Sequence, residues 1–355
     1  MAPDKGKAIR EAKIAEFNPN ENGLRETGIF GLPFGEDESL IVLLPVPWEA
    51  TVSYAEGTAH GPEAILKASR QIDLYDEILT GGWKAGIAMK EISETWHEAS
   101  HDYRARAKMY FQEIGSEEVI SPQALENLKA VNLASETLNK WVASETESLL
   151  NDGKIVGIVG GEHSVPLGYM QTLAKKYPSF GILQIDAHAD LRKAYEGFEY
   201  SHASIMYNAM QIQQISKLVQ VGIRDFCTEE AEFTESNKER IKAFTDYSIK
   251  RKLFSGSTWD DVCNEIIASL PEYIYISYDI DGLQPWLCPN TGTPVPGGLL
   301  LEETTYLIEK AITAGKKIIG FDLCEVAPGD GEWDGNVGCR VLYKLCLLTA
   351  KSNRL

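Results

Sequence analysis

The 355-residue sequence has no apolar run that approaches the roughly 18 residues needed for a membrane-spanning helix. Its first stretch, MAPDKGKAIREAKIAEFNPNENG, lacks the apolar core of a signal peptide. Internal repeats and low-complexity linkers are also missing. We therefore expect a cytoplasmic globular protein that does not contact a membrane.

Basic residues are scarce, because 34 Lys and Arg face 52 Asp and Glu, for a net charge of −18. Such a balance disfavours binding to a nucleic-acid backbone or to an anionic membrane. It suits a cationic substrate, although solubility alone is the simpler explanation.

Paired cysteines are absent as well. None of the six cysteines forms a CxxC motif, and Cys324 and Cys346 lie in apolar segments. We expect reduced structural thiols, and nothing in the pattern supports a cysteine nucleophile.

What the sequence does have is a regular alternation of apolar and amphipathic segments. The apolar segments predict strands at 39–48, 154–160, 180–186, 217–223, 273–281 and 316–326. The amphipathic or polar segments predict helices at 61–76, 123–150, 164–177, 228–243, 257–270, 301–315 and 335–352. This alternation predicts an α/β fold with a mostly parallel sheet covered on both faces.

The same pattern bounds the domains. We expect one α/β domain over 38–355, because the regular part shows no break in composition. Residues 1–37 are polar and rich in Asn, Gly and Pro, which indicates an N-terminal arm or surface loop. Residues 80–122 do not fit the alternation and are interpreted as an insertion.

Chemically active side chains follow four of the predicted strands. Because ligands bind at the carboxyl ends of the strands in open α/β sheets, we expect these side chains to meet at one edge. They are His163 in GGEHS, Asp186, His188 and Asp190 in DAHAD, Asp279 and Asp281 in DID, and Glu325 in CEV.

The spacing of these residues points to metal ions. Side chains two apart share a face of a strand, so Asp186, His188 and Asp190 point the same way if the chain stays extended. Carboxylates crowded together repel unless cations neutralise them. An oxygen-rich site with some imidazole suits Mn²⁺, Fe²⁺ or Ni²⁺, and two such ions can generate hydroxide near neutral pH.

Each motif alone has a simpler explanation. DIDG is more often a turn or a helix cap, and GGEHS can be a tight turn with a hydrogen-bonded histidine. The joint occurrence of all the motifs at strand ends makes that explanation improbable. The other three histidines, His60, His97 and His101, are assigned to surface or loop positions.

These motifs identify a family resemblance. GGEHS, DAHAD, SYDIDGLQPWLCPNTGTPVPGG and FDLCEVAP, in this order, resemble the ureohydrolase family of arginase, agmatinase and formimidoylglutamase. The resemblance runs from about residue 39 to the C-terminus, and DAHADLRKAYEGFEYSHAS is most similar to the agmatinase branch. It implies a three-layer α/β/α fold with a mostly parallel eight-stranded sheet, and a homotrimer or homohexamer.

The resemblance also implies the chemistry. It implies two Mn²⁺ ions that hydrolyse a guanidino C–N bond and release urea, with Asp186 and Asp279 bridging the ions. Glu325 resembles the glutamate that holds the guanidinium group, and His202 the histidine that shuttles a proton. The implied ligands are His163, Asp186, Asp190 and Asp279 for one ion, and His188, Asp186, Asp279 and Asp281 for the other.

A mechanism follows from these roles. A guanidinium ion is a poor electrophile, so the site must supply hydroxide, hold the cation and protonate the leaving amine. Asp190 is expected to accept a hydrogen bond from the hydroxide, and His202 or Asp190 to deliver the proton.

Four positions depart from the family pattern or bear on the substrate. Glu162 replaces the aspartate of many members at a non-ligand position, and Gln284 and Asn290 replace an aspartate and a glycine in the loop behind the metals. Arg192 follows DAHAD, where arginases carry a polar residue that reads the amino-acid end of their substrate, so arginine is disfavoured.

The sequence predicts agmatine, a small cationic guanidino compound, as the first substrate, with Glu196 near its second cationic group. Loop packing is an equal explanation for Glu196. Guanidine, formimidoylglutamate and other guanidino acids remain alternatives, and a pocket closed by the arm or by 80–122 favours guanidine. Rivals outside this chemistry are a metallophosphoesterase, a zinc deacetylase and a degenerate polyamine-binding homologue.

Overall fold

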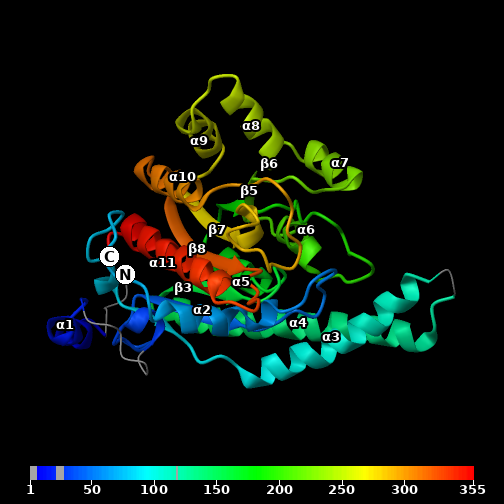
Figure 1. Cartoon of the computed structure of the whole chain (residues 1–355), viewed down its shortest axis with the longest axis horizontal. Coiled ribbons are helices and arrows are strands. Elements are labelled where there is room, and N and C mark those ends of the chain that lie inside the picture. Colours follow the sequence, from blue (N-terminus) through cyan, green and yellow to red (C-terminus); the bar gives the residue numbers. More distant parts are fainter. Residues whose placement is uncertain (1–5, 21–27, 117–118) are drawn as a thin grey trace.

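One eight-stranded, all-parallel sheet organises the chain (Figure 1). The structure, a computed structural model, describes residues 6–20, 28–116 and 119–355. The strands are β1 (Ile41–Val46), β2 (Ile87–Met89), β3 (Ile155–Gly160), β4 (Phe180–Ile185), β5 (Ile215–Val221), β6 (Ile241–Phe244), β7 (Tyr273–Asp279) and β8 (Lys317–Cys324). They lie in the order β2-β1-β3-β8-β7-β4-β5-β6.

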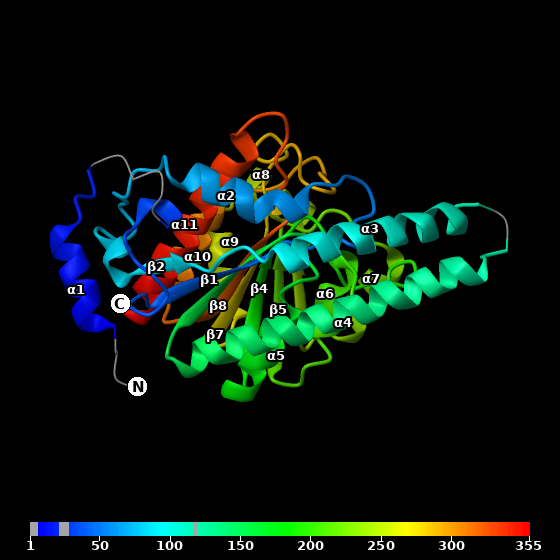
Figure 2. The ribbon, with the colours of Figure 1, turned by 90° about the horizontal axis from the view of Figure 1, so that it is seen from below.

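Helices cover both faces, which confirms the three-layer α/β/α prediction (Figure 2). The helices α2, α9, α10 and α11 pack on one face, and α4, α5 and α6 on the other. The α-helices are α1 (Lys7–Glu16), α2 (Gly61–Ser69), α3 (Glu94–Ile114), α4 (Pro122–Asn151), α5 (Leu167–Lys176), α6 (Ile205–Ala209), α7 (Thr228–Ser236), α8 (Asp246–Phe254), α9 (Trp259–Ala268), α10 (Leu301–Thr313) and α11 (Trp333–Asn353).

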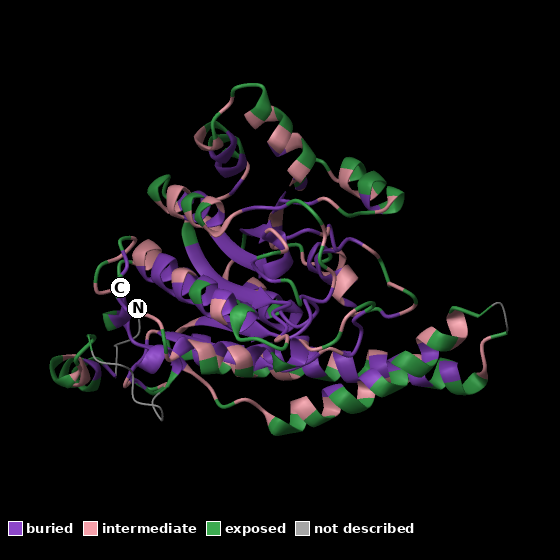
Figure 3. Ribbon diagram, viewed as in Figure 1, coloured by how far each residue is buried: buried purple, intermediate pink, exposed green. Residues whose placement is uncertain are grey.

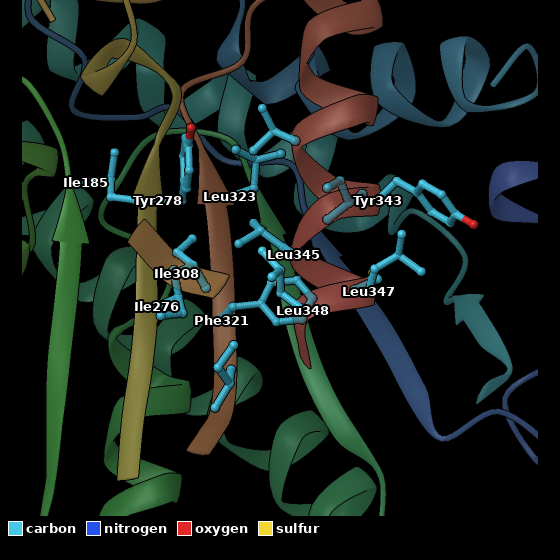
Figure 4. Close-up of a cluster of buried hydrophobic side chains, with 14 of the residues drawn as sticks. Ile185, Ile276, Tyr278, Ile308, Phe321, Leu323, Tyr343, Leu345, Leu347 and Leu348 are labelled. Carbon is cyan, nitrogen blue, oxygen red and sulfur yellow. The ribbon is translucent and has the colours of Figure 1, made fainter. Parts of the chain in front are cut away.

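The core explains why the strands are continuous apolar runs. Neighbouring residues of a strand point to opposite faces, so Ile182 joins the cluster under α4 and α5, and Leu183 joins the cluster under α11. Figure 4 shows part of the second cluster, where Leu345 and Leu348 of α11 face Phe321 of β8. This packing fixes the strand ends that carry the polar motifs.

Six of the eight strands match the predicted segments, and the other two are short. β2 lies in the segment interpreted as an insertion, and β6 lies at the end of the predicted helix 228–243. The prediction of a continuous helix there is wrong: α7 ends at Ser236, and the chain then adds a strand at the edge of the sheet.

The middle of the segment 80–122 forms the 21-residue helix α3, which packs along α4. The two helices form a hairpin whose far end extends beyond the sheet (Figures 2 and 3). α3 carries Ser93 as its N-cap, and α4 carries Ser121 followed by Pro122, so capping residues define both helix starts.

The N-terminal segment is more than a surface loop. α1 packs Ile14 and Phe17 against the core, and the Phe17 ring lies 5.1 Å from the ring of Trp83. Ile29 and Phe30 are buried. The surface-loop interpretation is therefore wrong for these described residues, whereas the division into an arm and one domain stays a prediction.

Across the described ranges, no helix combines the length and the apolar character needed to cross a membrane.

Candidate metal centre

The predicted site residues gather at the carboxyl ends of four neighbouring strands in the middle of the sheet. His163 follows β3, Asp186 follows β4, Asp279 ends β7 and Glu325 follows β8. Strands distant in sequence are adjacent here, since β8 lies between β3 and β7. The sheet topology thus brings together residues that are far apart in the sequence, for example His163 and Glu325, which are separated by 162 positions.

His163 lies at the centre of the first group of side chains. Its Nδ1 atom is 3.1 Å from Asp186 Oδ2, 3.2 Å from Asp190 Oδ2 and 3.3 Å from Asp279 Oδ2. All four residues are buried, yet Nδ1 has no hydrogen-bond partner of good geometry. One nitrogen facing three carboxylate oxygens is the arrangement expected around a cation rather than around a proton.

A second group surrounds His188. Its Nδ1 atom is 3.0 Å from Asp281 Oδ2 and 3.7 Å from Asp186 Oδ1. Asp281 Oδ2 is also buried and without a hydrogen-bond partner. Asp186 therefore belongs to both groups, with one carboxylate oxygen directed to each. The residues present fit two divalent ions that share a ligand.

The charges of this cluster show why it needs cations. Burial opposes the imidazolium form, but the carboxylates around His163 raise its pKa well above the ordinary value. Asp281 and Asp186 likewise outweigh burial and raise the pKa of His188 to about 12. Burial, and next the charge of Asp186, raises the pKa of Asp190 to about 7. Without metal ions the cluster thus retains protons, which divalent ions would replace.

A chain of hydrogen bonds orients His163. Its Nε2 atom lies 2.9 Å from Ser277 Oγ, and that hydroxyl donates to Asp322 Oδ2 at 2.8 Å. If Nε2 carries the proton, the lone pair of Nδ1 points at the carboxylates, as a metal ligand requires. Gln184 fixes Asp186 in a similar way, since its Nε2 donates to Asp186 Oδ2 at 2.8 Å.

Two of the site residues have strained backbones. Asp190 has φ of 55° and Glu325 has φ of 64°, a region that non-glycine residues rarely adopt. The expectation of an extended chain through Asp190 is therefore wrong, although its carboxylate still reaches His163. In both cases the strain directs a carboxylate toward the centre or its border.

Glu325 is buried beside the first group. Its Oε1 atom accepts the backbone N–H of His163 at 2.8 Å. Burial, with the charges of Glu162 and Asp281, raises the pKa of Glu325 well above its ordinary value. A cation next to this carboxylate would lower its pKa again, so the position favours a positively charged ligand.

His202 connects to the first turn after β1. Its backbone N–H donates to Thr51 Oγ1 at 3.2 Å, and its Nδ1 lies 3.4 Å from the same oxygen. The Thr51 hydroxyl in turn donates to Glu162 Oε1 at 3.0 Å. Burial, and then the charge of His188, lowers the pKa of His202 to about 3, so this imidazole is neutral at physiological pH.

Glu162 anchors this arrangement from below. Its carboxylate accepts the backbone N–H of Thr51 at 2.7 Å and the hydroxyl of Ser164 at 2.6 Å. Burial nevertheless raises the pKa of Glu162 to about 7. The side chain is not part of either group described above, and its role as a non-ligand stays a prediction.

An open cavity of about 430 Å³ leads from the solvent to the centre. Its exposed border includes Tyr54 and Phe226, which are 80% and 44% exposed. The lining residues are Ser53, Tyr54, His188, Asp190, Arg192, Tyr195, His202, Ala203, Asp225, Phe226, Glu230, Thr293, Pro294 and Val295.

The two predicted substrate contacts differ in position. Arg192 lines the cavity, with its guanidinium 5.1 Å from the ring of Tyr195 and its Nε 3.7 Å from Glu230 Oε2. Glu196 is exposed and is not among the lining residues. Its contact with a second cationic group stays a prediction.

The loop departures do not reach the centre directly. The Gln284 side chain accepts a hydrogen bond from Trp286 Nε1 at 2.7 Å. Asn290 bonds Asp334 twice, through its backbone N–H at 3.0 Å and its side-chain amide at 2.9 Å. Both residues thus stabilise the loop that carries the neighbouring Gly292, which approaches Glu325.

Sequence reasoning missed several supporting residues. Gln184, Ser277 and Asp322 are polar residues inside otherwise apolar strand segments, and that interruption was the available signal. Thr51 gave no local signal, because its role depends on a contact with His202, 151 positions away.

The comparisons with known proteins agree with this geometry. The model of the arginase family matches residues 39–347. The chain therefore belongs to the arginase family, whose members depend on two metal ions. It is a ureohydrolase, a hydrolase that acts on non-peptide C–N bonds of linear amidines.

Two relatives of known name and one solved structure are similar to most of the chain. The chain is 30% identical to the N(1)-aminopropylagmatine ureohydrolase of Synechocystis sp., over 89% of this chain and 91% of that one. It is 32% identical to the enzyme of the same name from Thermus thermophilus, over 84% and 87%. The agmatine ureohydrolase structure from Thermoplasma volcanium shares the fold, with a TM-score of 0.69, 22% identity and coverage of 97% and 99%.

Proposed function

We propose that the chain hydrolyses the guanidino group of a linear guanidino amine, agmatine or N1-aminopropylagmatine, and releases urea and a polyamine. The relatives of about 30% identity that carry the second name are the observation on which the proposal rests. The shape and the charge of the cavity support it independently.

The cavity has room for more than a guanidinium group. Its volume of about 430 Å³ lies in the range of cavities that hold extended small molecules. Neither the N-terminal arm nor the segment 80–122 contributes a lining residue among those described. The described parts of these two segments therefore do not close the cavity, which supports a longer substrate than free guanidine.

The lining also favours an amine tail over a carboxylate tail. Asp225 and Glu230 line the cavity, and Tyr54, Tyr195 and Phe226 offer aromatic faces that attract cations. Of the described lining residues, Arg192 is the one Lys or Arg, and it lies beside Glu230. Arginine, formimidoylglutamate and other guanidino acids would find little to pair with their carboxylates.

For the metals we propose two Mn²⁺ ions, with Ni²⁺ or Fe²⁺ as alternatives. One ion would be held by His163, Asp186, Asp190 and Asp279, and the other by His188, Asp186, Asp279 and Asp281. When bound, the two ions supply a water molecule of lowered pKa at neutral pH. The unpartnered Nδ1 of His163 and Oδ2 of Asp281 support this assignment.

The protein's own residues perform the remaining steps. Glu325 holds the planar guanidinium through charge-assisted hydrogen bonds, and Asp190 accepts a hydrogen bond from the attacking water. The leaving amine needs a proton. A neutral His202 acts as a relay that takes a proton and passes it on, because its low pKa prevents it from storing one at rest.

A substrate screen tests the proposal. Purified protein loaded with Mn²⁺, and separately with Ni²⁺, is given agmatine, N1-aminopropylagmatine, guanidine, arginine and formimidoylglutamate, and urea, ammonia and formamide are measured. We expect the guanidino amines to exceed the others in kcat/KM by at least about tenfold, since a lost ion pair costs about that factor. A preference for guanidine or for a guanidino acid would refute it.

A matched pair of variants locates the amine tail. Asp225→Asn should raise KM for agmatine several-fold, because Asp225 lines the cavity. Glu196→Gln tests the sequence-based prediction at an exposed position with the same acid-to-amide change. A larger effect at Glu196 than at Asp225 would indicate that the amine tail of the substrate binds at the loop 195–200.

Light scattering on the purified protein tests the predicted homotrimer or homohexamer.

A further inference from the structure

A second cavity holds the three histidines that neither the metal centre nor the proposed proton relay uses. His60 ends the short 3-10 helix Thr58–His60, and His97 and His101 lie in the first turns of α3. All three line a cavity of about 530 Å³ that shares no lining residue with the catalytic cavity. Half of the histidines of the chain are thus gathered at a place where the ureohydrolase reaction requires none.

The two nearer imidazoles are spaced as ligands of one ion. His97 Nε2 lies 3.3 Å from His60 Nδ1, and the rings meet edge to face at 67°. Two imidazole nitrogens bound at about 2.0–2.1 Å to one ion lie about 2.8–3.4 Å apart for angles from square to tetrahedral. The observed separation falls within that range, and it is longer than a good hydrogen bond between two nitrogens.

The sequence of α3 supplies a third imidazole in the right register. Residues 97–101 read HEASH, with the two histidines four positions apart on a helix. Side chains at this spacing lie on one helix face, and HExxH on a helix is a known pattern for binding Zn²⁺. The His101 side chain is 88% exposed with its Nδ1 3.8 Å from Asp102 Oδ1, so it has to turn from this position to reach the other two.

The charges around the cavity are compatible with a cation. Glu49, Glu98 and Asp102 line it together with the histidines. The two cations of the lining, Arg104 and Lys108, both pair with Glu56, at 2.9 Å and 2.6 Å. Glu56 offsets one of these two positive charges, and Glu49, Glu98 and Asp102 together outweigh the other.

We propose that His60, His97 and His101 form a separate metal site, which binds one Zn²⁺ or a similar imidazole-preferring ion. The donors distinguish it from the catalytic centre, because imidazole nitrogen favours Zn²⁺, Ni²⁺ or Cu²⁺, and carboxylate oxygen favours Mn²⁺.

An ion at this site joins α3 to the turn after β1. Glu49 accepts the backbone N–H of Gly57 at 2.6 Å, so the turn is held together internally. The same turn carries Thr51 and Ser53, which contact His202, and Tyr54, which lines the catalytic cavity. The ion would thus tie the α3–α4 hairpin to the border of the active site.

Metal content of matched variants tests the proposal. Wild-type protein, His97→Gln and the control Glu94→Gln are loaded with Mn²⁺, dialysed against micromolar Zn²⁺ and analysed for both elements. Glu94 lies on α3 but outside the cavity lining. We expect the wild type and Glu94→Gln to retain one more Zn²⁺ per chain than His97→Gln, because the catalytic contribution is common to all three. Equal zinc contents would overturn the proposal.

A measurement on the unmodified protein covers the case in which His97→Gln does not fold. Cu²⁺ is bound, and pulsed electron paramagnetic resonance counts the imidazole nitrogens on each ion. The proposed site has two or three imidazoles, whereas each catalytic ion is expected to have one. A signal from ions with several imidazoles supports the site, and single-imidazole signals alone would refute it.

The thermal midpoint of unfolding, Tm, also tests whether an ion connects α3 to the turn after β1. Zn²⁺ should raise the Tm of the Mn²⁺-loaded wild type more than that of His97→Gln, because an ion that binds only the folded state stabilises it. Equal shifts would refute the tie. None of these readouts uses urea release, so the metal site and the proposed substrate can fail independently.

Discussion

The chain uses its histidines in two contrasting settings. His163 is 1% exposed and lies just after the central strand β3, where its backbone N–H is bonded to buried Glu325. The side chain of His101 is 88% exposed and lies on a helix outside the sheet. In the first setting, the protein fixes the position of the imidazole before a metal ion binds. In the second, the imidazole takes its final position only when the ion binds. We therefore expect substitutions near the strand ends to change activity or stability more than substitutions on the helices outside the sheet.

The largest effect is expected at Asp186, the carboxylate shared by both metal-ligating groups. Asp186→Asn should lower kcat by at least about 10³-fold, because removing a ligand common to both ions abolishes the activated water. Removal of the metals with a chelator should have the same effect and be reversed by Mn²⁺. Both experiments are followed by urea release and by metal content. Substantial activity in metal-free protein would contradict the importance assigned to the metal centre.

His202 borders the centre without belonging to either group, so its effect should be intermediate. His202→Gln should lower kcat by about 10²-fold, the ordinary contribution of a general acid or base. The metal content should equal that of the wild type. Loss of metal in this variant would place His202 among the ligands, and unchanged turnover would remove it from the mechanism.

Thr51 acts through His202 and should matter less. Thr51→Val removes the hydroxyl that links Glu162 to His202, and we expect kcat to fall about tenfold with little change in KM. Thr51→Ser retains the hydroxyl and should restore most of the activity. A rise in KM alone, or no rescue by serine, would indicate a packing role.

The low pKa of His202 predicts a pH dependence of stability. The unfolded chain binds a proton at His202 below pH about 6.5, whereas the folded chain does so only near pH 3. The wild type should therefore lose stability as the pH falls through this window, by about 1 kcal/mol at pH 5.5. His202→Gln should lose that much less between pH 7.5 and 5.5 in urea titrations. Parallel losses would show that His202 titrates normally.

The smallest effect is expected on the helical hairpin. Lys140 pairs with Glu136 one turn earlier on α4 at 2.7 Å, with both side chains substantially exposed. Lys140→Gln should change the free energy of unfolding by less than about 0.5 kcal/mol. A change of several kcal/mol in urea denaturation would show that the hairpin is as constrained as the strand ends.

The centre of the sheet was predictable from sequence because its signals are local. Strands β3, β4, β7 and β8 are apolar runs, and each ends in a polar motif, so their common edge followed from parallel topology alone. The short edge strands β2 and β6 were missed, since a few residues among polar neighbours carry too little periodicity.

The contacts between distant segments were not predictable. Nothing near Thr51 indicates that it meets His202, and nothing near His60 indicates that it faces α3. The left-handed backbone of Asp190 was also missed, because the alternation of DAHAD is equally compatible with an extended chain. Such features depend on how loops close over the sheet.

The position of β8 between β3 and β7 has a consequence for biosynthesis. The strand made last fills a gap between strands made earlier, and it brings Glu325 and the supporting Asp322 with it. During translation, the ligands that follow β3, β4 and β7 are therefore made before the central part of the sheet is complete. Metal bound before β8 joins the sheet would lack the support of Glu325 and Asp322, so the finished centre requires β8 in place.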